Sequence, residues 1–414
     1  MVATAAARVV VLAAARAALV LAAPRAPVVH DLFGADSSAG GWRGPALVTT
    51  NASVLIFGSG VLPSGAKGQA LRRSTDSGAS WSSPEVLPYP GMQPMYDPDS
   101  GDVVSLVHLP HNTSHSCAAA CGHFATRSSD DGRSWSVPTP AGGLANTTWG
   151  NGLASGVALR KGGALLAAIR TDCADPRANL PGGGWPANCT RNPDGSRAAW
   201  NPATERPHPT VDRALISTDS GVSWHAGGGT PLGTDGGASL GWTECQLAEL
   251  ANGSVVLTSR TIQPLSHAGA LPLQRVFAIS HTGGETWQER WWGFPANQSD
   301  GFGEGYNTEG SLISAAGGER LLLSKPTAGC GDARWPCNHN LYRRNMTVAS
   351  SSDGGSSWSI EAWGLVYAGL AAYSDMTELP NGQIGIAFER GTTQEYRFVS
   401  FAAITPPWRT DAAA

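Results

Sequence analysis

The sequence predicts an all-β protein, and its internal repeat predicts a six-bladed β-propeller. The chain of 414 residues is rich in Gly (52) and Pro (28), and only 14% of its residues are charged. This composition is typical of many short strands joined by tight turns. One short motif recurs along most of the chain, which indicates that similar blades follow one another in a single domain.

The repeated motif is Ser-x-Asp-x-Gly-x-x-Trp, and it predicts a turn. Four copies are complete, and a fifth has Thr282 in place of the Asp. The copies begin at Ser74, Ser128, Ser217, Ser280 and Ser351. The Asp side chain can accept backbone N–H groups of its own turn, and the Gly permits a positive φ. The Trp can then pack against the neighbouring blade at the outer rim, where its N–H finds a partner.

Short runs of β-forming residues precede the turns, so each turn is expected to join two antiparallel strands. These runs are Gln69–Arg72, Ala214–Ile216, Val276–Ile279 and Thr347–Ala349. Residues 32–408 have room for six units of roughly 60 residues, the size of a four-stranded blade with its loops. Residues 172–209, rich in Pro, Gly, Asn and Arg, are expected to form a loop insertion within this domain. The repeats indicate the fold and not the function.

Residues 1–23 are expected to form a signal peptide. Arg8 precedes an apolar stretch, Val9–Ala23, which ends in small residues and is interrupted by Arg16. An Ala-rich disordered tail is the alternative, and no later segment offers a charge-free run long enough to span a membrane. Seven Asn-x-Ser/Thr sequons fit a chain that enters the secretory pathway. They are Asn51, Asn112, Asn146, Asn188, Asn252, Asn297 and Asn345.

Seven cysteines fit the same compartment. Three close pairs are expected to form disulfides, and Cys245 would remain unpaired. The pairs are Cys117 with Cys121, Cys173 with Cys189, and Cys330 with Cys337. A zinc site is the weaker alternative, because neither these spacings nor the nearby histidines follow a ligand pattern. The net charge of −4 and the lack of a basic run give no support to nucleic-acid binding.

Four further patches carry a different kind of signal. They read Trp-Arg-Gly-Pro-Ala-Leu at 42–47, Thr-Glu-Cys-Gln at 243–246 with 249–257 and Arg260, Arg-Arg-Asn-Met-Thr-Val at 343–348, and Ala-Ala-Tyr-Ser-Asp-Met at 371–376 with 386–391. Together they resemble the exo-α-sialidases, nearest to the animal lysosomal type. The resemblance implies a sialidase-type propeller that removes terminal sialic acid with retention of configuration and needs no metal or other cofactor.

The resemblance also implies substrates and a location. Sialylated glycoproteins, gangliosides and oligosaccharides would be the substrates, and the location would be lysosomal, lumenal or extracellular. Membrane contact would come only through a glycolipid substrate or an uncleaved N-terminal segment.

The resemblance implies roles for individual residues. Tyr373 is the implied nucleophile, and Glu244 is the carboxylate that activates it. The implied ligands of the substrate carboxylate are Arg43, Arg260 and Arg343. Arg344 is the alternative to the last of these, and Glu389 is implied to support the first. Taken one at a time, an Arg is more often a surface charge and a Tyr more often part of the packing.

These residue types suit the chemistry of sialic acid. Its ionised carboxylate is attached to the anomeric carbon, and guanidinium groups bind it by planar, bidentate hydrogen bonds. Three such groups anchor the sugar while its ring distorts toward an oxocarbenium-like transition state. A carboxylate nucleophile would be repelled by the substrate's own anion, whereas a neutral tyrosine is not. Because a phenol has a pKa of about 10, it needs a neighbouring base such as Glu244.

One segment departs from the family. Family members carry an Arg and an Asp between the first arginine patch and the first repeat, and the Asp protonates the leaving group and later activates water. Here residues 54–67 contain no Asp, Glu or Arg, and the segment is shorter than in the family. Three explanations compete: the chain binds sialosides but cleaves them poorly, another carboxylate such as Asp36 substitutes, or a fragment was lost in gene prediction. A non-catalytic sialic-acid-binding propeller and an interaction scaffold are the alternative functions.

Overall fold

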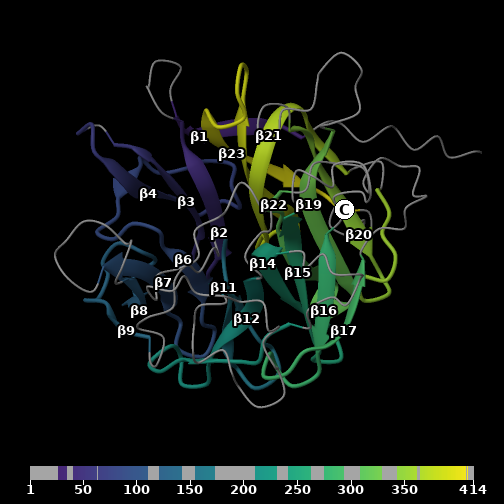
Figure 1. Cartoon of the computed structure of the whole chain (residues 1–414). Helices are drawn as coiled ribbons and strands as arrows, with labels where there is room; N and C mark the ends of the chain where they lie inside the picture. The colour runs from purple at the N-terminus through teal and green to yellow at the C-terminus, as the bar shows by residue number, and fades with distance from the viewer. Residues whose placement is uncertain are drawn as a thin grey trace, which may run out of the picture.

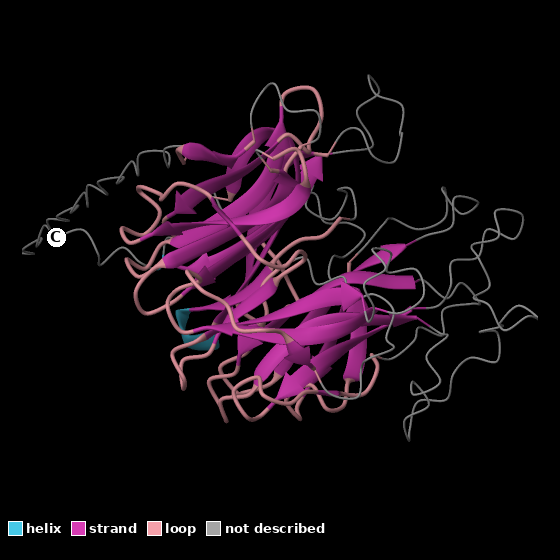
Figure 2. Ribbon diagram, turned by 90° about the vertical axis from the view of Figure 1, so that its left-hand side faces the viewer, coloured by secondary structure: helices cyan, strands magenta, loops and turns pink. Residues whose placement is uncertain are grey.

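The structure consists almost entirely of β-strands. The computed structural model describes residues 27–34, 41–62, 64–110, 121–141, 154–172, 210–230, 241–262, 275–292, 308–328, 343–360, 364–406 and 408. The described ranges contain one complete helix, the short 3-10 helix η3 (Ala316–Gly318), drawn in cyan in Figure 2. The prediction of an all-β protein is therefore confirmed. No helix within these ranges has the length and apolar character that a membrane span requires.

Four sheets have four antiparallel strands each, and strands that follow one another in the chain are neighbours in the sheet. The first sheet contains β2 (Arg43–Thr49), β3 (Val54–Val61), β4 (Lys67–Ser74) and β5 (Glu85–Val86). The second contains β6 (Gln93–Tyr96), β7 (Val103–Pro110), β8 (Cys121–Ser128) and β9 (Thr139–Pro140). The third contains β10 (Val157–Ala158), β11 (Leu165–Asp172), β12 (Thr210–Ser217) and β13 (His225–Ala226). The fourth contains β14 (Gly241–Glu249), β15 (Val255–Ile262), β16 (Val276–Ser280) and β17 (Gln288–Trp292).

A fifth sheet has seven strands, because one long strand pairs with one neighbour along its first half and with another along its second half. Its order is β1–β23–β22–β21–β20–β19–β18. The strands are β18 (Leu312–Ala315), β19 (Arg320–Ala328), β20 (Arg344–Ser351), β21 (Leu365–Glu378), β22 (Ile384–Gly391), β23 (Phe398–Ile404) and β1 (Val29–Phe33). The 14-residue β21 pairs with β20 through its first half and with β22 through its second half. The first and last strands of the described chain, β1 and β23, pair with each other.

The sheets are arranged around a central axis like the blades of a propeller (Figure 1). Contacts between strands run around this axis from β2 to β6, β10, β14, β18 and β21, and from β21 back to β2. Apolar side chains fill the space between sheets. In one cluster, Leu166 and Ile216 of the third sheet pack with Leu247 and Leu257 of the fourth. Burial of this apolar surface between sheets is the main stabilising term of such an architecture.

The repeated motifs form turns, as predicted. In the first copy, Oγ of Ser74 accepts from the Gly78 backbone N–H at 2.7 Å and donates to Oδ1 of Asp76 at 2.7 Å. The same carboxylate accepts from the Ser80 backbone N–H at 2.8 Å. The fifth copy keeps the turn without an Asp, because Oγ1 of Thr282 accepts from the backbone N–H four residues on at 2.9 Å. The predicted β runs that precede these turns lie in β4, β12, β16 and β20.

Each repeat turn packs against the preceding sheet. Gly78 has a φ of +89°, and a Cβ atom there would collide with the ring of Phe401 on β23. The Trp81 ring meets the same Phe401 ring edge-on, with centroids 5.0 Å apart, and its indole N–H donates to the Gly78 carbonyl at 3.1 Å. The first turn therefore joins the first sheet to the last one. The positive φ and the close contact together explain why Gly occupies this position.

Several predicted features lie outside the described residues. These are residues 1–23, residues 173–209 of the loop insertion, Asp36, and four of the sequons. None of the three predicted cysteine pairs has both side chains within the described part of the chain. Cys245 is described, and it is buried on β14.

Candidate active site

The six predicted site residues come from three sheets, and all but Tyr373 lie at or beside one end of their strands. In chain order they are Arg43 at the start of β2, Glu244 near the start of β14, Arg260 near the end of β15, Arg343 just before β20, Tyr373 in the middle of β21 and Glu389 near the end of β22. Because adjacent strands are antiparallel, the start of one strand and the end of the next lie at the same edge of a sheet. The ring arrangement then brings these edges together around the central axis.

Irregular backbone aims several of these side chains toward the axis. Glu244 lies in a β-bulge of β14 and has a φ of +55°, which is uncommon for a residue other than Gly. Further bulges lie just after Arg43 in β2 and at Tyr373 in β21. Bulges re-aim side chains, and a left-handed non-glycine residue costs about 1–3 kcal/mol. Such strain at a carboxylate facing the axis points to a functional position.

Tyr373, Glu244 and Arg260 form a chain of hydrogen bonds. The Tyr373 hydroxyl donates to Oε1 of Glu244. Nη1 of Arg260 donates to Oε2 of the same carboxylate at 2.8 Å. Tyr373 and Glu244 are each only 7% exposed. The carboxylate therefore lies between a phenol and a guanidinium in a site that is largely shielded from water.

The protonation states of this chain are set by its surroundings. Burial by itself raises the pKa of Glu244, but the charge and hydrogen bond of Arg260 lower that pKa below its ordinary value. Burial and the negative charge of Glu244 raise the pKa of Tyr373. At neutral pH Glu244 is therefore an ionised base beside a protonated phenol. This is the arrangement in which a carboxylate can take the phenol's proton during a nucleophilic attack.

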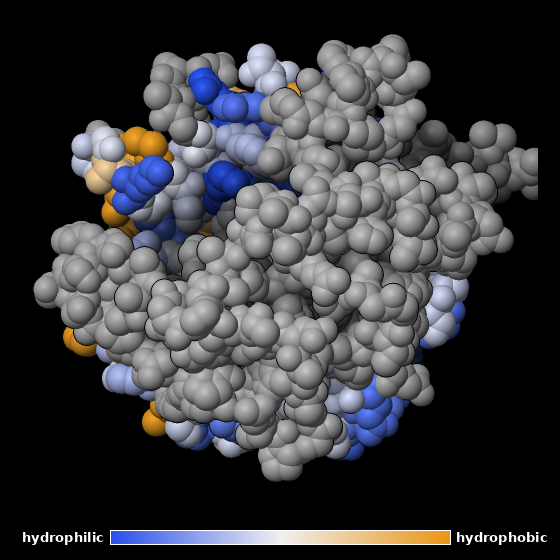
Figure 3. All heavy atoms as spheres, viewed as in Figure 1, coloured by the Kyte–Doolittle hydropathy of each residue, from blue (hydrophilic) through white to orange (hydrophobic). Residues whose placement is uncertain are grey.

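Glu389 connects Arg43 to the backbone of Tyr373. This fully buried carboxylate accepts from Nε of Arg43 at 3.1 Å and from the Gly44 backbone N–H at 2.9 Å. Its other oxygen accepts from the Tyr373 backbone N–H at 3.3 Å. The Arg43 side chain remains 45% exposed, so its charge is available to a ligand. Figure 3 shows strongly hydrophilic side chains (blue) on this side of the molecule, close to β1 and β2.

Two arginines flank the Tyr373 ring. Cζ of Arg43 lies 5.0 Å from the ring centroid, and Cζ of Arg343 lies 5.5 Å from it. Arg343 is only 2% exposed, whereas Arg344 is exposed on β20. The structure thus places Arg343, and not Arg344, beside Tyr373. All three arginines named from the resemblance surround the same phenol, because Arg260 reaches it through Glu244.

Three polar residues beside the site, one half-buried and two buried, were not predicted from the sequence. Tyr396, just before β23, lies with its ring centroid 4.0 Å from Cζ of Arg43. Glu309, just before β18, is 1% exposed, and burial together with the charge of Glu244 raises its pKa well above the ordinary value. Burial lowers the pKa of Arg275 to about 10. None of the three belongs to a recognisable motif, so no signal in the sequence marks them.

The hairpin of β3 and β4 approaches Arg43 but brings no carboxylate. The two strands pair from Val54 with Ser74 up to Val61 with Lys67. Ser59 of β3 pairs with Arg43, so the turn end of this hairpin lies beside the site. In its described part, which omits only Pro63, the hairpin holds no Asp or Glu between residues 54 and 67. The hairpin therefore brings no side-chain carboxylate to this edge of the site.

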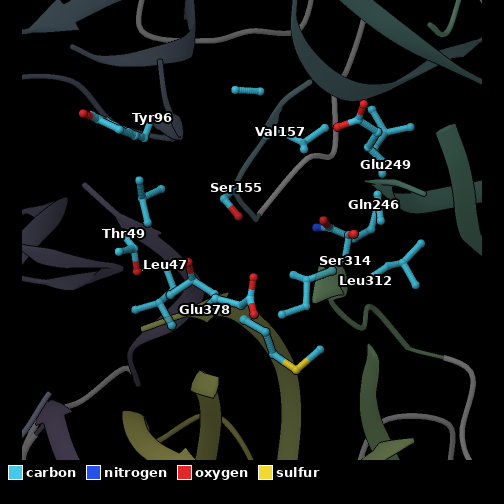
Figure 4. A pocket seen from close by; sticks show the side chains of 18 of the residues that line it. Leu47, Thr49, Tyr96, Ser155, Val157, Gln246, Glu249, Leu312, Ser314 and Glu378 are labelled. Carbon is cyan, nitrogen blue, oxygen red and sulfur yellow. Dashed lines mark hydrogen bonds between the residues drawn. The ribbon is translucent and has the colours of Figure 1, made fainter. Parts of the chain in front are cut away.

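A separate cavity of about 380 Å³ opens at the opposite end of the inner strands. Figure 4 shows that Leu47, Ser155, Gln246, Ser314 and Glu378 face a common space there. These residues lie farther along their strands than the candidate site residues, so the cavity is a different place. Across all described residues, no group of three or more His, Cys, Asp or Glu side chains is placed to hold a metal ion.

Sequence and fold comparisons agree on one group of proteins. A model of the BNR repeat-like domain matches residues 89–386. A curated sialidase from Micromonospora viridifaciens is 24% identical over 262 residues, which cover 59% of this chain and 35% of the sialidase. The matched part thus spans about a third of the length of that curated relative.

Solved structures share the fold at low sequence identity. The Hadza microbial sialidase Hz136 superposes with a TM-score of 0.57 at 20% identity, covering 88% of this chain and 65% of the other. An intramolecular trans-sialidase from Ruminococcus gnavus gives a TM-score of 0.59 at 14% identity, covering 91% of this chain and 97% of the other. At these identities the likeness concerns the fold alone. The family model covers well over half of the sequence, so the chain belongs to the BNR repeat-like domain family.

Proposed function

We propose that this chain is an exo-α-sialidase that hydrolyses terminal sialic acid with retention of configuration. One observation carries the proposal: a buried phenol, Tyr373, donates to an ionised carboxylate, Glu244, in the middle of three arginines. A cluster of guanidiniums selects a carboxylate ligand, and the phenol is a neutral nucleophile that such a ligand does not repel. The sialidases found by sequence and by fold support the same reaction class.

In the first step, the substrate carboxylate binds Arg43, Arg260 and Arg343. The Tyr373 oxygen attacks the anomeric carbon while its proton passes to Glu244, and the bond to the leaving-group oxygen breaks. The leaving group takes a proton from water, since the β3–β4 hairpin supplies no acid. In the second step, water attacks the anomeric carbon of the glycosyl-tyrosine and loses a proton to the hydroxide that the first step left in solution, and Glu244 returns its proton to the Tyr373 oxygen. Two displacements at one carbon give net retention.

We also infer that the propeller has six blades. The seven-stranded sheet divides at β21 into β18–β19–β20 with the first half of β21, and β23–β22–β1 with the second half. Each part then has four strands, like the other four sheets. The cavity at the far end supports this count, because residues at the ends of β2, β6, β10, β14, β18 and β21 line it together. The last blade would be closed by the N-terminal strand β1.

We propose sialylated glycans of the secretory pathway as the substrates. Two of the described sequons support this location, because Asn51 and Asn252 are exposed in turns. Both turns follow the far ends of β2 and β14, so glycans on them would not cover the candidate site.

Substitution of the nucleophile tests the function. Tyr373→Phe is expected to lower the hydrolysis of an aryl sialoside by about 10³-fold or more, because no oxygen remains to attack the anomeric carbon. The variant should still bind an unsaturated sialic-acid analogue, since the arginines are unchanged. Tyr367→Phe is the matched control, because Tyr367 also lies on β21 and accepts from an arginine, Arg390, at 3.2 Å. Proton NMR of the first product should show the α-anomer.

Two results would contradict the proposal. Activity of Tyr373→Phe close to that of the wild type would exclude this residue as the nucleophile. Failure of the wild-type protein to release sialic acid while it binds the analogue would leave a sialic-acid-binding protein instead of an enzyme.

A further inference from the structure

Tyr396 contacts two of the three arginines that surround Tyr373. The guanidinium of Arg43 lies over its ring, with Cζ 4.0 Å from the centroid. Nη1 of Arg343 donates to its hydroxyl oxygen at 3.1 Å. One side chain therefore offers its face to one guanidinium and its edge oxygen to another. Both contacts are attractive for a cation, the first through the ring quadrupole and the second through a charge-assisted hydrogen bond.

Tyr373, Tyr396, Arg43 and Arg343 form a ring of contacts in which each tyrosine contacts both arginines. Arg43 lies between the rings of Tyr396 and Tyr373, and Arg343 contacts the ring of Tyr373 and the hydroxyl of Tyr396. Two positive charges that repel each other are thus separated by two aromatic groups that attract both. Burial raises the pKa of Tyr396, so its hydroxyl stays neutral over the range in which the arginines are charged. This arrangement fixes the spacing of the guanidiniums before any ligand arrives.

The backbone around Tyr396 is tied to the segment that leads into Arg43. A Cβ atom on Gly41 would collide with the Tyr396 carbonyl, so the two segments touch at that point. The next backbone N–H, that of Trp42, donates to the Arg397 carbonyl at 3.4 Å, and Arg397 N–H donates to the Arg390 carbonyl at 3.1 Å. Tyr396 is therefore held relative to both Arg43 and the end of β22. Because the connection between β22 and β23 is short and held by these hydrogen bonds, the Tyr396 side chain can fix the distance between the two guanidiniums.

We propose that Tyr396 is a positioning residue that sets the distance and orientation of Arg43 and Arg343 for a single carboxylate ligand. The inference rests on the proposed function, because it assumes that these arginines bind the carboxylate of a sialoside. It adds a residue that does not take part in the bond-making steps. Its effect is exerted on ligand binding, through the two guanidiniums.

Two substitutions separate the two contacts. Tyr396→Phe keeps the ring over Arg43 and removes the hydroxyl that accepts from Arg343. It is expected to weaken binding of 2,3-dehydro-2-deoxy-N-acetylneuraminic acid by about 10-fold, the usual effect of losing one hydrogen bond to a charged group. Tyr396→Leu also removes the ring and is expected to weaken binding by about a further 3- to 10-fold. KM should rise in parallel, while kcat stays within about 2-fold, because Tyr373 and Glu244 are unchanged.

A neutral probe distinguishes positioning from general damage to the fold. The methyl ester of the same analogue should bind the wild type and Tyr396→Phe equally weakly, because it presents no carboxylate to the arginines. Tyr367→Phe is the matched control and should bind the acid as the wild type does. Calorimetric titration of each protein with both probes provides these constants.

The possible results test the positioning role of Tyr396 separately from the proposed sialidase function. If the wild type binds the acid and Tyr396→Phe binds it equally well, the positioning role is wrong and the proposed function stands. If Tyr396→Phe loses affinity for acid and ester alike, the residue acts through the fold and the positioning role is again wrong. If the wild type binds neither probe, the proposed function fails, and this inference fails with it.

Discussion

At the residue scale, two buried carboxylates, Glu389 and Glu244, hold the candidate site together. Glu389 is fully buried and accepts three hydrogen bonds, from Nε of Arg43 and from the backbone N–H groups of Gly44 and Tyr373. Glu244 is nearly as buried and bridges Arg260 to the Tyr373 hydroxyl. A buried charge is costly unless it is paired and fully hydrogen-bonded. These two carboxylates meet that condition only when the arginines are in place, so the site is organised before a ligand binds.

Removal of the charge on Glu389 should therefore weaken ligand binding. Glu389→Gln keeps the size of the side chain but loses the ion pair that orients Arg43. We expect the Kd for the unsaturated analogue and the KM for an aryl sialoside to rise about 10- to 100-fold, the range for a hydrogen bond between charged groups. Calorimetry and initial rates give these values. Glu378→Gln is the control, because Glu378 lies at the end of β21 that is away from the candidate site. An unchanged Kd in Glu389→Gln would contradict the assigned role.

The sequence predicts some residues of the site and not others, for physical reasons. Glu244 and Arg260 are predictable because each lies in a patch with a recognisable frame. Arg343 and Arg344 are adjacent, so the sequence alone leaves both open, and only the bulged start of β20 decides which of them points toward Tyr373. Tyr396 cannot be predicted, because its role depends on a contact with Arg43, more than 300 residues earlier in the chain.

At the element scale, each complete repeat turn is stabilised by hydrogen bonds between an Asp carboxylate and groups of the same turn. In three of them, Asp76, Asp130 and Asp219 have a pKa of about 2. Hydrogen bonds from the Ser hydroxyl and backbone N–H four residues on hold the pKa of Asp76 low. In the other two turns burial is the largest single effect and raises the pKa, but the hydrogen bonds together outweigh it. The fifth turn makes the corresponding bond with Thr282, which does not titrate. The sequence predicts these turns well, because every interaction lies within eight residues.

Acid should therefore destabilise the protein through these turns. The folded-state pKa of each Asp lies below its unfolded value of 3.8, so the ionised form stabilises the fold above about pH 4. That contribution is lost as the pH falls toward about 2, and each share is small because the groups are exposed. Asp219→Thr copies the turn at Thr282 and should make the free energy of unfolding less dependent on pH between 4 and 2. Urea unfolding at several pH values measures this, and an unchanged pH dependence would refute it.

At the scale of the whole molecule, the ring is closed by contacts between the ends of the chain. β1 pairs with β23, and the first repeat turn packs Trp81 on Phe401 of β23. The sequence predicts a propeller from the repeat but not the sharing of β21 between two pairings. Residues 365–378 contain Gly369 as their only turn-favouring residue of the Gly or Pro type, so the strand runs on without a break. Whether one long strand serves two neighbours depends on the packing of the whole ring, which no local pattern encodes.

The shape of the ring also places the β3–β4 hairpin beside Arg43 without a carboxylate, which predicts how the proposed sialidase activity depends on the leaving group. A sugar leaving group needs a proton as it departs, whereas an activated phenol does not. Loss of a general acid costs about 10²–10⁴-fold in rate, so kcat/KM for sialyllactose should fall below that for an aryl sialoside by a factor in this range. Initial rates on the two substrates measure the ratio. Asp36→Asn is the informative variant: if it slows sialyllactose hydrolysis and leaves the aryl sialoside unaffected, Asp36 supplies the proton and the site has its acid. Equal rates on both substrates in the wild type would likewise show that a proton donor reaches the leaving group from outside the hairpin.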